Sequence, residues 1–174
     1  MVAVSDTGPL IWLGRYDLLR LLKGLYSKVL IPEAVYREAV TVGVERGHKD
    51  AFLIEKAVED GWVEVCKSTV EGIAIARKAE GALGVELGGG EREAIALALG
   101  RGVKTVLTDD EETYFTGRRL GLEAKGVLYI LLRSVRKGVL RREEAGRLVN
   151  QMLKDGLWLS PLIIQKFHET LDRL

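Results

Sequence analysis

Four short apolar runs, rich in β-branched residues and separated by helical segments, constrain the fold of this chain most strongly. These runs cover residues 1–5, 29–31, 62–66 and 103–108, and residues 122–125 could be a brief fifth strand. Short apolar runs of this kind are typical of strands that are buried within a sheet. Strands that alternate with helices predict a parallel sheet with helices on both of its faces. We therefore expect an α/β protein with three layers and a short parallel sheet of about five strands.

The segments between these runs carry helical patterns. The first begins at Pro9 and ends near Gly24, and the second begins at Pro32 with Val35, Ala39 and Val40 on its apolar face. Further helices are expected over residues 49–59, 70–80, 91–101, 111–120, 127–137, 141–154 and 161–171. A chain of 174 residues is long enough to bury one core without disulfides. We expect a single domain over residues 1–174, in which the helices from about residue 141 could form an appended helical subdomain.

The composition excludes several classes of protein. The chain is 47% hydrophobic and 29% charged with a net charge of +1, so any basic surface for nucleic acid must be local. The single cysteine, Cys66, excludes an internal disulfide framework, and with only His48 and His168 a Cys/His zinc site is not expected. There is no basic leader, and no apolar stretch approaches the roughly 18 residues that span a bilayer. We expect a cytoplasmic protein without a membrane partner.

Two short motifs resemble known functional motifs, but the rest of the chain does not support either function. Asp6-Thr7-Gly8 is the tripeptide found around the catalytic aspartate of aspartic proteases. Those enzymes are all-β, and a chain with this many helical segments cannot supply that setting. Gly88-Gly89-Gly90 is not a phosphate-binding P-loop, because no lysine and serine follow it, and we expect it to link two helices.

Acidic residues stand where strands of the expected sheet end. Asp6 follows the first strand, the adjacent Asp109 and Asp110 follow the fourth, and Glu38 lies about two turns into the helix after the second. Glu91 opens an alanine-rich helix at the edge of its buried face. Parallel strands bring their carboxyl ends to one edge of the sheet, where α/β proteins bind ligands. Converging carboxylates repel one another unless cations lie between them, and oxygen ligands favour Mg²⁺ or Mn²⁺, which can promote attack of water on a phosphodiester.

Each acid also has a structural interpretation. An aspartate at a strand end often caps the next helix, and Asp109-Asp110 could be an acidic first turn that the helix dipole favours. Glu38 could be a solvated helix residue, and Glu91 or Glu93 an N-terminal charge. The joint arrangement of the acids favours the metal site.

Four segments, in order, resemble the PIN-domain nucleases. They are VSDTGPLIWLGRYDLLRLL, VLIPEAVYREAV, GGGEREAIALAL and VLTDDEE, and the later GVLYILLRSVRKG and LWLSPLIIQKF extend the resemblance over nearly the whole chain. The closer likeness is to a prokaryotic subfamily related to the VapC toxins. The resemblance implies a PIN-like fold. It also implies that Asp6, Glu38 and Glu91 are the first three acids of a metal site, with Thr7 beside the first aspartate to orient it.

The resemblance leaves the fourth acid open. VapC-like chains often read Thr-x-Asp, which corresponds to Asp110, whereas the closer subfamily often reads Asp-Asp or Asp-Glu, which corresponds to Asp109. Glu93 is a weaker alternative to Glu91, because it turns away from the face that Glu91 shares with Ile95.

The function that the resemblance implies is hydrolysis of RNA by an endoribonuclease that depends on Mg²⁺ or Mn²⁺, as the toxin of a toxin–antitoxin pair. Such toxins commonly form homodimers and bind a small antitoxin protein that blocks the acidic pocket. Basic residues near the acids would hold RNA through its phosphates. The expected contacts for the substrate are Thr7, Arg118, Arg133, Arg136 and Lys137, with solvated helix ends as the alternative interpretation of the basic residues. Tyr114 or Phe115 could stack on a base, although core packing is the expectation for Phe115.

Two other functions stay open. A PIN-like scaffold could bind RNA or protein without cleaving anything, which would fit the loss of an acid, yet every expected acid is present. A haloacid-dehalogenase-type phosphatase needs an acid or a threonine two residues after its first aspartate, and this chain has Gly8 there.

Overall fold

The computed structural model describes residues 1–174 and contains one sheet of five strands, all of them parallel. The strands are β1 (Val2–Ser5), β2 (Lys28–Pro32), β3 (Val63–Cys66), β4 (Thr105–Leu107) and β5 (Glu123–Lys125). Their order in the sheet is β3-β2-β1-β4-β5, so the direction of strand addition reverses between β1 and β4. Open α/β sheets bind ligands at such a reversal, beyond the carboxyl ends of the strands. The expected α/β fold with a short parallel sheet is confirmed.

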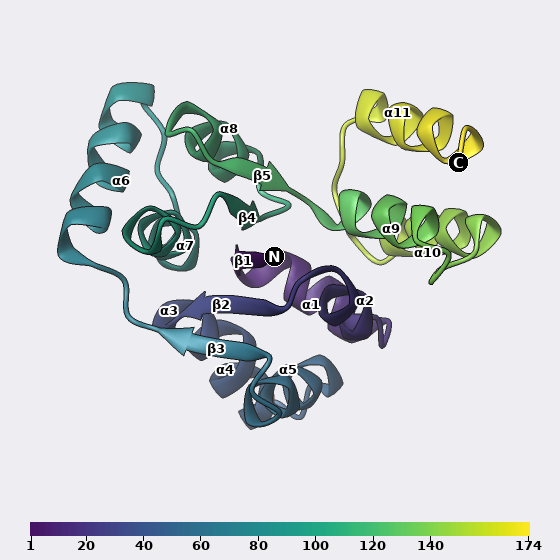
Figure 1. Cartoon of the computed structure of the whole chain (residues 1–174), viewed down its shortest axis with the longest axis horizontal. Helices are drawn as coiled ribbons and strands as arrows, with labels where there is room; N and C mark the ends of the chain where they lie inside the picture. The colour runs from purple at the N-terminus through teal and green to yellow at the C-terminus, as the bar shows by residue number, and fades with distance from the viewer. The chain divides into compact units, whose positions relative to one another are not determined.

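Helices of two groups connect the strands. The first group is α1 (Thr7–Arg15), α2 (Leu19–Leu25), α3 (Glu33–Tyr36), the π-helix η1 (Arg37–Thr41), α4 (Val42–Glu45) and α5 (Lys49–Glu59). The second group is α6 (Val70–Leu83), α7 (Gly89–Arg101) and α8 (Glu111–Arg119). The chain moves along the sheet in opposite directions in the two groups, so right-handed crossovers place them on opposite faces. Accordingly, α1 packs against α5, and α6 packs against α7 (Figure 1).

Two helices that the sequence predicted as continuous are interrupted. The expected helix from Pro9 to Gly24 is two helices, α1 and α2, because Asp17 adopts a left-handed conformation with φ of 57° between them. Aspartate is one of the few residues with a side chain that tolerates this region. In the expected helix from Pro32, where Pro32 is the N-cap, the chain stays helical from α3 to α4, but the π-turn η1 interrupts the regular α-helical hydrogen bonding.

Several predicted boundaries differ by a few residues. The expected strand 103–108 is paired only over Thr105–Leu107, since the Val103 N–H bonds to the Ala98 carbonyl oxygen of the preceding helix. The link between the helices expected over residues 70–80 and 91–101 is shorter than predicted, because α6 continues to Leu83 and α7 begins at Gly89. The first turn of α7 therefore includes Gly89 and Gly90 as well as Glu91.

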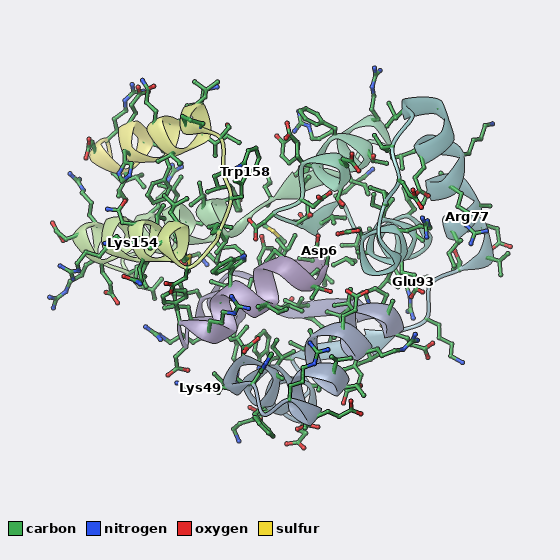
Figure 2. The ribbon with its side chains drawn as sticks, turned by 180° about the vertical axis from the view of Figure 1, so that it is seen from behind. Asp6, Lys49, Arg77, Glu93, Lys154 and Trp158 are labelled. Carbon is green, nitrogen blue, oxygen red and sulfur yellow. The ribbon has the colours of Figure 1, made fainter.

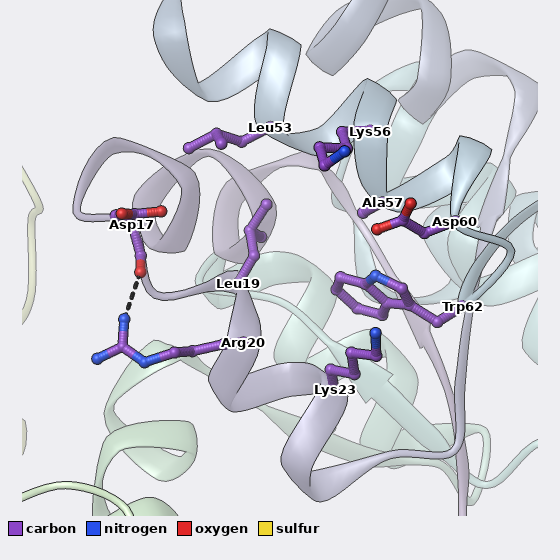
Figure 3. Close-up of a pocket in the computed structure, with 9 residues that line it drawn as sticks. All are labelled: Asp17, Leu19, Arg20, Lys23, Leu53, Lys56, Ala57, Asp60 and Trp62. Carbon is purple, nitrogen blue, oxygen red and sulfur yellow. Dashed lines mark hydrogen bonds between the residues drawn. The ribbon is translucent and has the colours of Figure 1, made fainter.

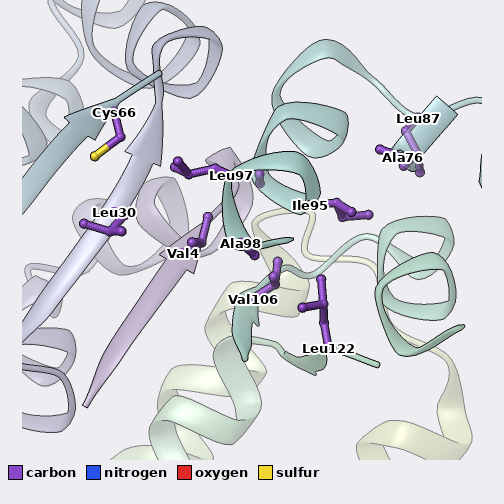
Figure 4. Close-up of a cluster of buried hydrophobic side chains, with 11 residues drawn as sticks. Val4, Leu30, Cys66, Ala76, Leu87, Ile95, Leu97, Ala98, Val106 and Leu122 are labelled. Carbon is purple, nitrogen blue, oxygen red and sulfur yellow. The ribbon is translucent and has the colours of Figure 1, made fainter. Parts of the chain in front are cut away.

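A hydrophobic cluster fixes α7 on the sheet. Val4, Leu30 and Val106 from three neighbouring strands pack with Ile95 and Leu97 of α7, and all five side chains are buried (Figure 4). Burying one large aliphatic side chain is worth roughly 1.5–3 kcal/mol, so the cluster holds this helix firmly across β1, β2 and β4. The start of α7 is thereby placed beside the carboxyl ends of the strands.

The contacts divide the chain into two compact units, Met1–Val127 and Leu128–Leu174. The second unit contains most of α9 (Val127–Arg136), together with α10 (Arg142–Lys154) and α11 (Pro161–Asp172). Within it, α10 contacts α11, and Val149, Met152, Phe167 and Leu171 are buried on these two helices. None of the helices in the structure combines the length and the apolar character needed to cross a membrane.

Candidate active site

Asp6 lies directly after β1, at the point where the order of strands reverses. Its backbone N–H bonds to the Leu107 carbonyl oxygen at 2.9 Å, which continues the pairing of β1 with β4. Its carboxylate caps α1, because Oδ1 accepts a hydrogen bond of 3.1 Å from the Gly8 N–H. The Thr108 hydroxyl also donates to this carboxylate. Asp6 is only 3% exposed, and burial, followed by the nearby charges of Asp109 and Glu91, raises its pKa well above 3.8.

Asp109 lies two residues after β4 and has a buried carboxyl group with one unused oxygen. Oδ1 accepts a hydrogen bond of 2.7 Å from the Val127 N–H, whereas Oδ2 is buried without any hydrogen-bond partner. Burial raises the pKa of this carboxyl group to about 6. Buried polar atoms without a partner are rare and call for an explanation, such as a bound ion.

Gly8 shows that Asp6 and Asp109 border the same small space. A methyl group built on the Gly8 Cα would lie 3.6 Å from Asp6 Oδ1 and 3.8 Å from Asp109 Oδ2. Glycine at this position leaves room for a group of about the size of a methyl. Asp6 Oδ1 and Asp109 Oδ2 therefore lie near the same point at the reversal of the strand order, and Asp109 Oδ2 has no partner.

Asp110 has a different role from its neighbour. It is the N-cap of α8, and its Oδ1 accepts hydrogen bonds of 2.7 Å from both the N–H and the hydroxyl of Thr113. The residue is exposed. Of the two interpretations of the Asp109-Asp110 pair, the helix cap thus applies to Asp110, and the candidate metal ligand applies to Asp109.

Glu38 lies on the π-helix η1, where the Val42 N–H bonds to the Arg37 carbonyl oxygen five residues earlier. Its Oε2 accepts a hydrogen bond of 2.7 Å from the Thr7 hydroxyl. A methyl group built on Gly90 would lie 2.8 Å from the same oxygen, so Glu38 is close to the start of α7. Thr7 was expected to orient Asp6, but its hydroxyl orients Glu38, and Thr108 is the hydroxyl residue that bonds to Asp6.

Glu91 lies in the first turn of α7 and accepts a hydrogen bond from the Gly88 N–H. Burial raises its pKa, and the charges of Asp110, Glu38 and Glu112 add to the shift. Glu91 is thus within electrostatic reach of carboxylates on two other elements, η1 and α8. Together with its effect on Asp6, this links all five predicted acids in one electrostatic cluster at the carboxyl edge of the sheet.

Glu93 does not join this cluster. Its Oε2 accepts a long hydrogen bond of 3.5 Å from the Ala34 N–H, and its carbonyl oxygen accepts one of 3.0 Å from the Ser68 hydroxyl. Glu93 therefore connects α7 to the start of α3 and to the loop before α6. Figure 2 shows Asp6 and Glu93 on their separate elements.

The donor set of the site consists only of oxygen atoms, which suits a hard divalent cation. Burial raises the pKa values of Asp6, Glu91 and Asp109, and neighbouring acids add to the shift at Asp6 and Glu91, so the charged forms of these carboxylates are disfavoured without a counter-charge. In the side-chain positions of the structure, no three acidic, histidine or cysteine side chains converge closely enough to hold an ion. The unpartnered Asp109 Oδ2 and the room left by Gly8 nevertheless fit such a group.

The predicted basic residues lie in two places. Arg118 is exposed in the last turn of α8 and belongs to the same unit as the acids. Arg133, Arg136 and Lys137 belong to the second unit, so the acid cluster is built without them. Phe115 is 57% exposed, and the expectation that it packs in the core is wrong.

Two cavities occur in the first unit, and neither is lined by the clustered acids. One, of about 490 Å³, is lined by Leu83, Phe115, Arg118 and Arg119. The other, of about 270 Å³, lies beside Trp62, which precedes β3, and has Arg20, Lys23 and Lys56 on its wall (Figure 3). This second cavity is near the amino end of β3, whereas the acids follow the carboxyl ends of the strands. The candidate site is therefore identified by its clustered carboxylates and not by a cavity.

A parallel sheet with this strand order, and with acids gathered where the order reverses, defines a PIN-like α/β protein. The crystal structure of VapBC2 from Rickettsia felis, bound to a DNA fragment from their promoter, has a similar fold. That comparison has a TM-score of 0.52 and 15% sequence identity, and it covers 72% of this chain and 98% of the other. Mycobacterium tuberculosis VapC20, a toxin that cleaves the sarcin–ricin loop, matches with a TM-score of 0.49 and 20% identity over 66% of this chain and 95% of the other.

The family itself is identified by sequence. The sequence profile of a PIN-domain family matches residues 2–173, and the chain belongs to that family. The family resemblance inferred from the sequence is thereby confirmed. No functionally curated protein is similar enough in sequence to match the chain.

Proposed function

We propose that the protein is an endoribonuclease that hydrolyses RNA phosphodiesters and depends on Mg²⁺ or Mn²⁺. The observation that carries the proposal is the buried, unpartnered Asp109 Oδ2, which lies beside Gly8 together with Asp6 Oδ1. Membership of a PIN-domain family supports the assignment. A haloacid-dehalogenase-type phosphatase finds no support, because Gly8 stands where its acid or threonine is needed.

In this proposal, Asp6 and Asp109 hold the cation, with Glu38 and Glu91 at the border of the site. A bound divalent ion lowers the pKa of an attacking water and offsets negative charge on the phosphodiester. The protein keeps its acids in place by fixed hydrogen bonds. The Thr108 hydroxyl orients Asp6, the Val127 N–H fixes Asp109, and the Thr7 hydroxyl holds Glu38. Thr7 is thus a positioning residue rather than a contact for RNA.

The proposal is tested by cleavage of a mixed panel of structured and single-stranded RNAs. We expect cleavage with Mn²⁺ or Mg²⁺, none with EDTA, and a loss of at least about 100-fold for Asp6→Asn, which is roughly 3 kcal/mol of transition-state stabilisation. Asp50→Asn is a matched control, since Asp50 is another buried aspartate of the first unit and lies on α5. Cleavage that survives both EDTA and Asp6→Asn would disprove the proposed site. A stably folded protein that binds RNA but never cleaves it would favour the silent binding module instead.

We also propose that the protein acts as the toxin of a toxin–antitoxin pair, with a small antitoxin protein and a second copy of the chain as partners. The support is the fold shared with the VapBC2 complex, together with the family resemblance. Induction of the wild-type chain alone should arrest growth of a bacterial host, whereas Asp6→Asn at the same expression level should not. Equal growth of both strains would argue against a toxin without affecting the assignment as a nuclease.

A further inference from the structure

The cavity between α6 and α8 is lined by aromatic, aliphatic and basic side chains and by none of the clustered acids. Its volume is about 490 Å³, and it is lined by Leu83 at the end of α6 and by Phe115, Arg118 and Arg119 on α8. The two helices contact each other directly. An aromatic ring and an aliphatic side chain beside two guanidinium groups form a surface suited to a ligand that is both flat and anionic.

Phe115 is presented to solvent although its helix buries another face. Thr113, Thr116 and Gly117 are the buried residues of α8, and they share the helix face that packs on the protein. Phe115 points away from that face and is 57% exposed, and its ring forms a T-shaped pair with the ring of Tyr114 at 5.5 Å between ring centroids. Phe115 therefore presents an accessible aromatic ring on the wall of the cavity, beside Arg118 and Arg119.

The cavity is connected to the acid cluster along one face of α8. Glu112, Phe115 and Arg119 are three and four residues apart, so they form one row on the helix surface. Glu112 lies in the first turn of α8, which Asp110 caps, so the start of the row is next to the clustered acids. The row from Glu112 to Arg119 is about 10 Å long. A single extended ligand can therefore occupy the acid cluster and the cavity together.

We propose that this cavity is a subsite for single-stranded RNA, in which one base stacks on Phe115 and the adjoining phosphates contact Arg118 and Arg119. Stacking on aromatic rings and phosphate contacts with arginine are the two interactions by which proteins hold unpaired nucleotides. The positive wall of the cavity complements the phosphates, whereas the clustered carboxylates would repel them without a cation. The subsite therefore supplies the affinity for RNA that the acids cannot. The inference rests on the proposed function, because it assigns the substrate of the same site.

The test measures RNA binding apart from cleavage. A short, unstructured, fluorescently labelled RNA is titrated with Asp6→Asn protein in EDTA, and binding is followed by fluorescence anisotropy. In this background Phe115→Leu should weaken binding on the order of tenfold, because leucine keeps the apolar bulk and loses the ring. Phe115→Trp should retain the parent affinity. Phe52→Leu is the matched control, since Phe52 is 48% exposed on α5, away from the cavity.

The arginines are tested through the salt dependence of binding. Joint replacement by Arg118→Gln and Arg119→Gln should make the slope of log K against log salt less steep by about 1.4, as expected for two lost phosphate contacts on a single strand. Arg46→Gln with Lys49→Gln removes the same charge elsewhere in the first unit and should leave the slope unchanged. Equal losses in the cavity variants and their controls would overturn the subsite.

The outcomes separate the subsite from the proposed nuclease. If RNA affinity were unchanged in every cavity variant, the cavity would not be an RNA subsite, and a protein segment would be its better candidate ligand. This result would not contradict the proposed nuclease, whose cleavage would still require Asp6 and a metal. Binding that depends on Phe115, by a protein that cleaves no RNA, would support the subsite and overturn only the nuclease.

Discussion

Asp109 and Asp110 are neighbours in the sequence, but their carboxylates have opposite surroundings. Asp109 Oδ2 is buried without a partner, whereas Asp110 is exposed and Asp110 Oδ1 is engaged twice by Thr113 at the start of α8. A cation would supply the missing partner of the Asp109 carboxylate. At Asp110 it would have to compete with the hydrogen bonds that cap α8. Asp109 is therefore the stronger candidate for the fourth acid of the site, and Asp110 contributes charge near Glu91.

Substitution by asparagine distinguishes the two residues, because it keeps the shape and an acceptor oxygen while it removes the charge. We expect Asp109→Asn to weaken Mn²⁺ binding at least about tenfold, which corresponds to roughly 1.4 kcal/mol. Asp110→Asn should preserve the cap of α8, since asparagine is as good an N-cap as aspartate, and change Mn²⁺ binding much less. Calorimetric titration of both variants measures the difference. A larger effect for Asp110→Asn would reverse the assignment.

The sequence predicted the acids at the carboxyl edge of the sheet, but not how each one is held. Short strands that end just before Asp6 and Asp109 indicate their place, because parallel strands share one carboxyl edge. The role of Thr108 depends on the register of β4 against β1, and the bond from Thr7 to Glu38 depends on a π-turn. These partners come from tertiary geometry, which local patterns do not contain. The triplet Thr108-Asp109-Asp110 was the only available signal for the hydroxyl partner of Asp6.

At the scale of whole elements, an ion pair closes the connection that leads into α7. Glu80 at the end of α6 is buried and accepts hydrogen bonds of 2.7 and 2.8 Å from Arg92 and of 2.8 Å from the Leu87 N–H. Arg92 in turn donates to the Leu87 carbonyl oxygen at 2.7 Å. The hydrogen bond from Arg92 lowers the pKa of Glu80. Because Arg92 is next to Glu91, the pair fixes the turn that presents Glu91 to the site.

Breaking this pair should affect both stability and the metal site. Arg92→Ala leaves a mostly buried carboxylate without its partner, which costs roughly 3 kcal/mol in comparable cases. We also expect weaker Mn²⁺ binding, since the first turn of α7 loses its anchor. The two effects are measured by thermal unfolding and by calorimetric titration at a temperature where the variant is folded.

An exposed ion pair of the same unit provides the control for Arg92→Ala. Lys28 and Glu64 are paired across β2 and β3, and their side chains are 43% and 45% exposed. Glu64→Ala should therefore cost less than about 1 kcal/mol and leave Mn²⁺ binding unchanged. A loss of stability in Arg92→Ala with unaltered Mn²⁺ affinity would limit the Glu80–Arg92 pair to a structural role.

The helix boundaries predicted from the sequence differ from those in the structure where the backbone departs from regular α-helical geometry. The pattern of Val35, Ala39 and Val40 fits one α-helix, but the chain inserts the π-turn η1 there. Single π-turns inside helices frequently occur at functional sites, and here the π-turn carries Glu38. Likewise, the leucine pattern between Pro9 and Gly24 does not reveal the left-handed Asp17. The apolar periodicity survives such interruptions, so it predicts helical segments better than it predicts their continuity.

For the molecule as a whole, the strand order explains why acids from distant parts of the sequence meet. The first three strands extend the sheet in one direction, and β4 then returns to the other side of β1. This return brings Asp109 beside Asp6 and leaves no strand between them. The same topology concentrates like charges inside a buried site, so the stability of the first unit depends on their protonation or on a cation.

The pKa of Asp109 fixes the direction of that dependence. Its folded-state pKa of about 6 is above the ordinary value of 3.8, so the folded protein binds this proton more tightly than the unfolded chain does. The stabilising contribution is complete below about pH 4 and is lost as the pH rises through about 6. The loss amounts to roughly 3 kcal/mol at neutral pH without metal. The pKa values of Asp6 and Glu91 are also raised, so their contributions have the same sign.

Urea unfolding of the metal-free wild type and of Asp109→Asn, measured across this pH range, tests the dependence. Asparagine does not titrate, so the stability of the wild type relative to the variant should fall between about pH 4 and pH 7. Mn²⁺ at pH 7 should restore the stability of the wild type, because an ion that binds only the folded protein stabilises it by mass action. The same ion should stabilise the variant much less. If the difference between the two proteins were the same at every pH, the Asp109 carboxylate would not be an uncompensated charge, and the strongest argument for a cation at this site would be lost.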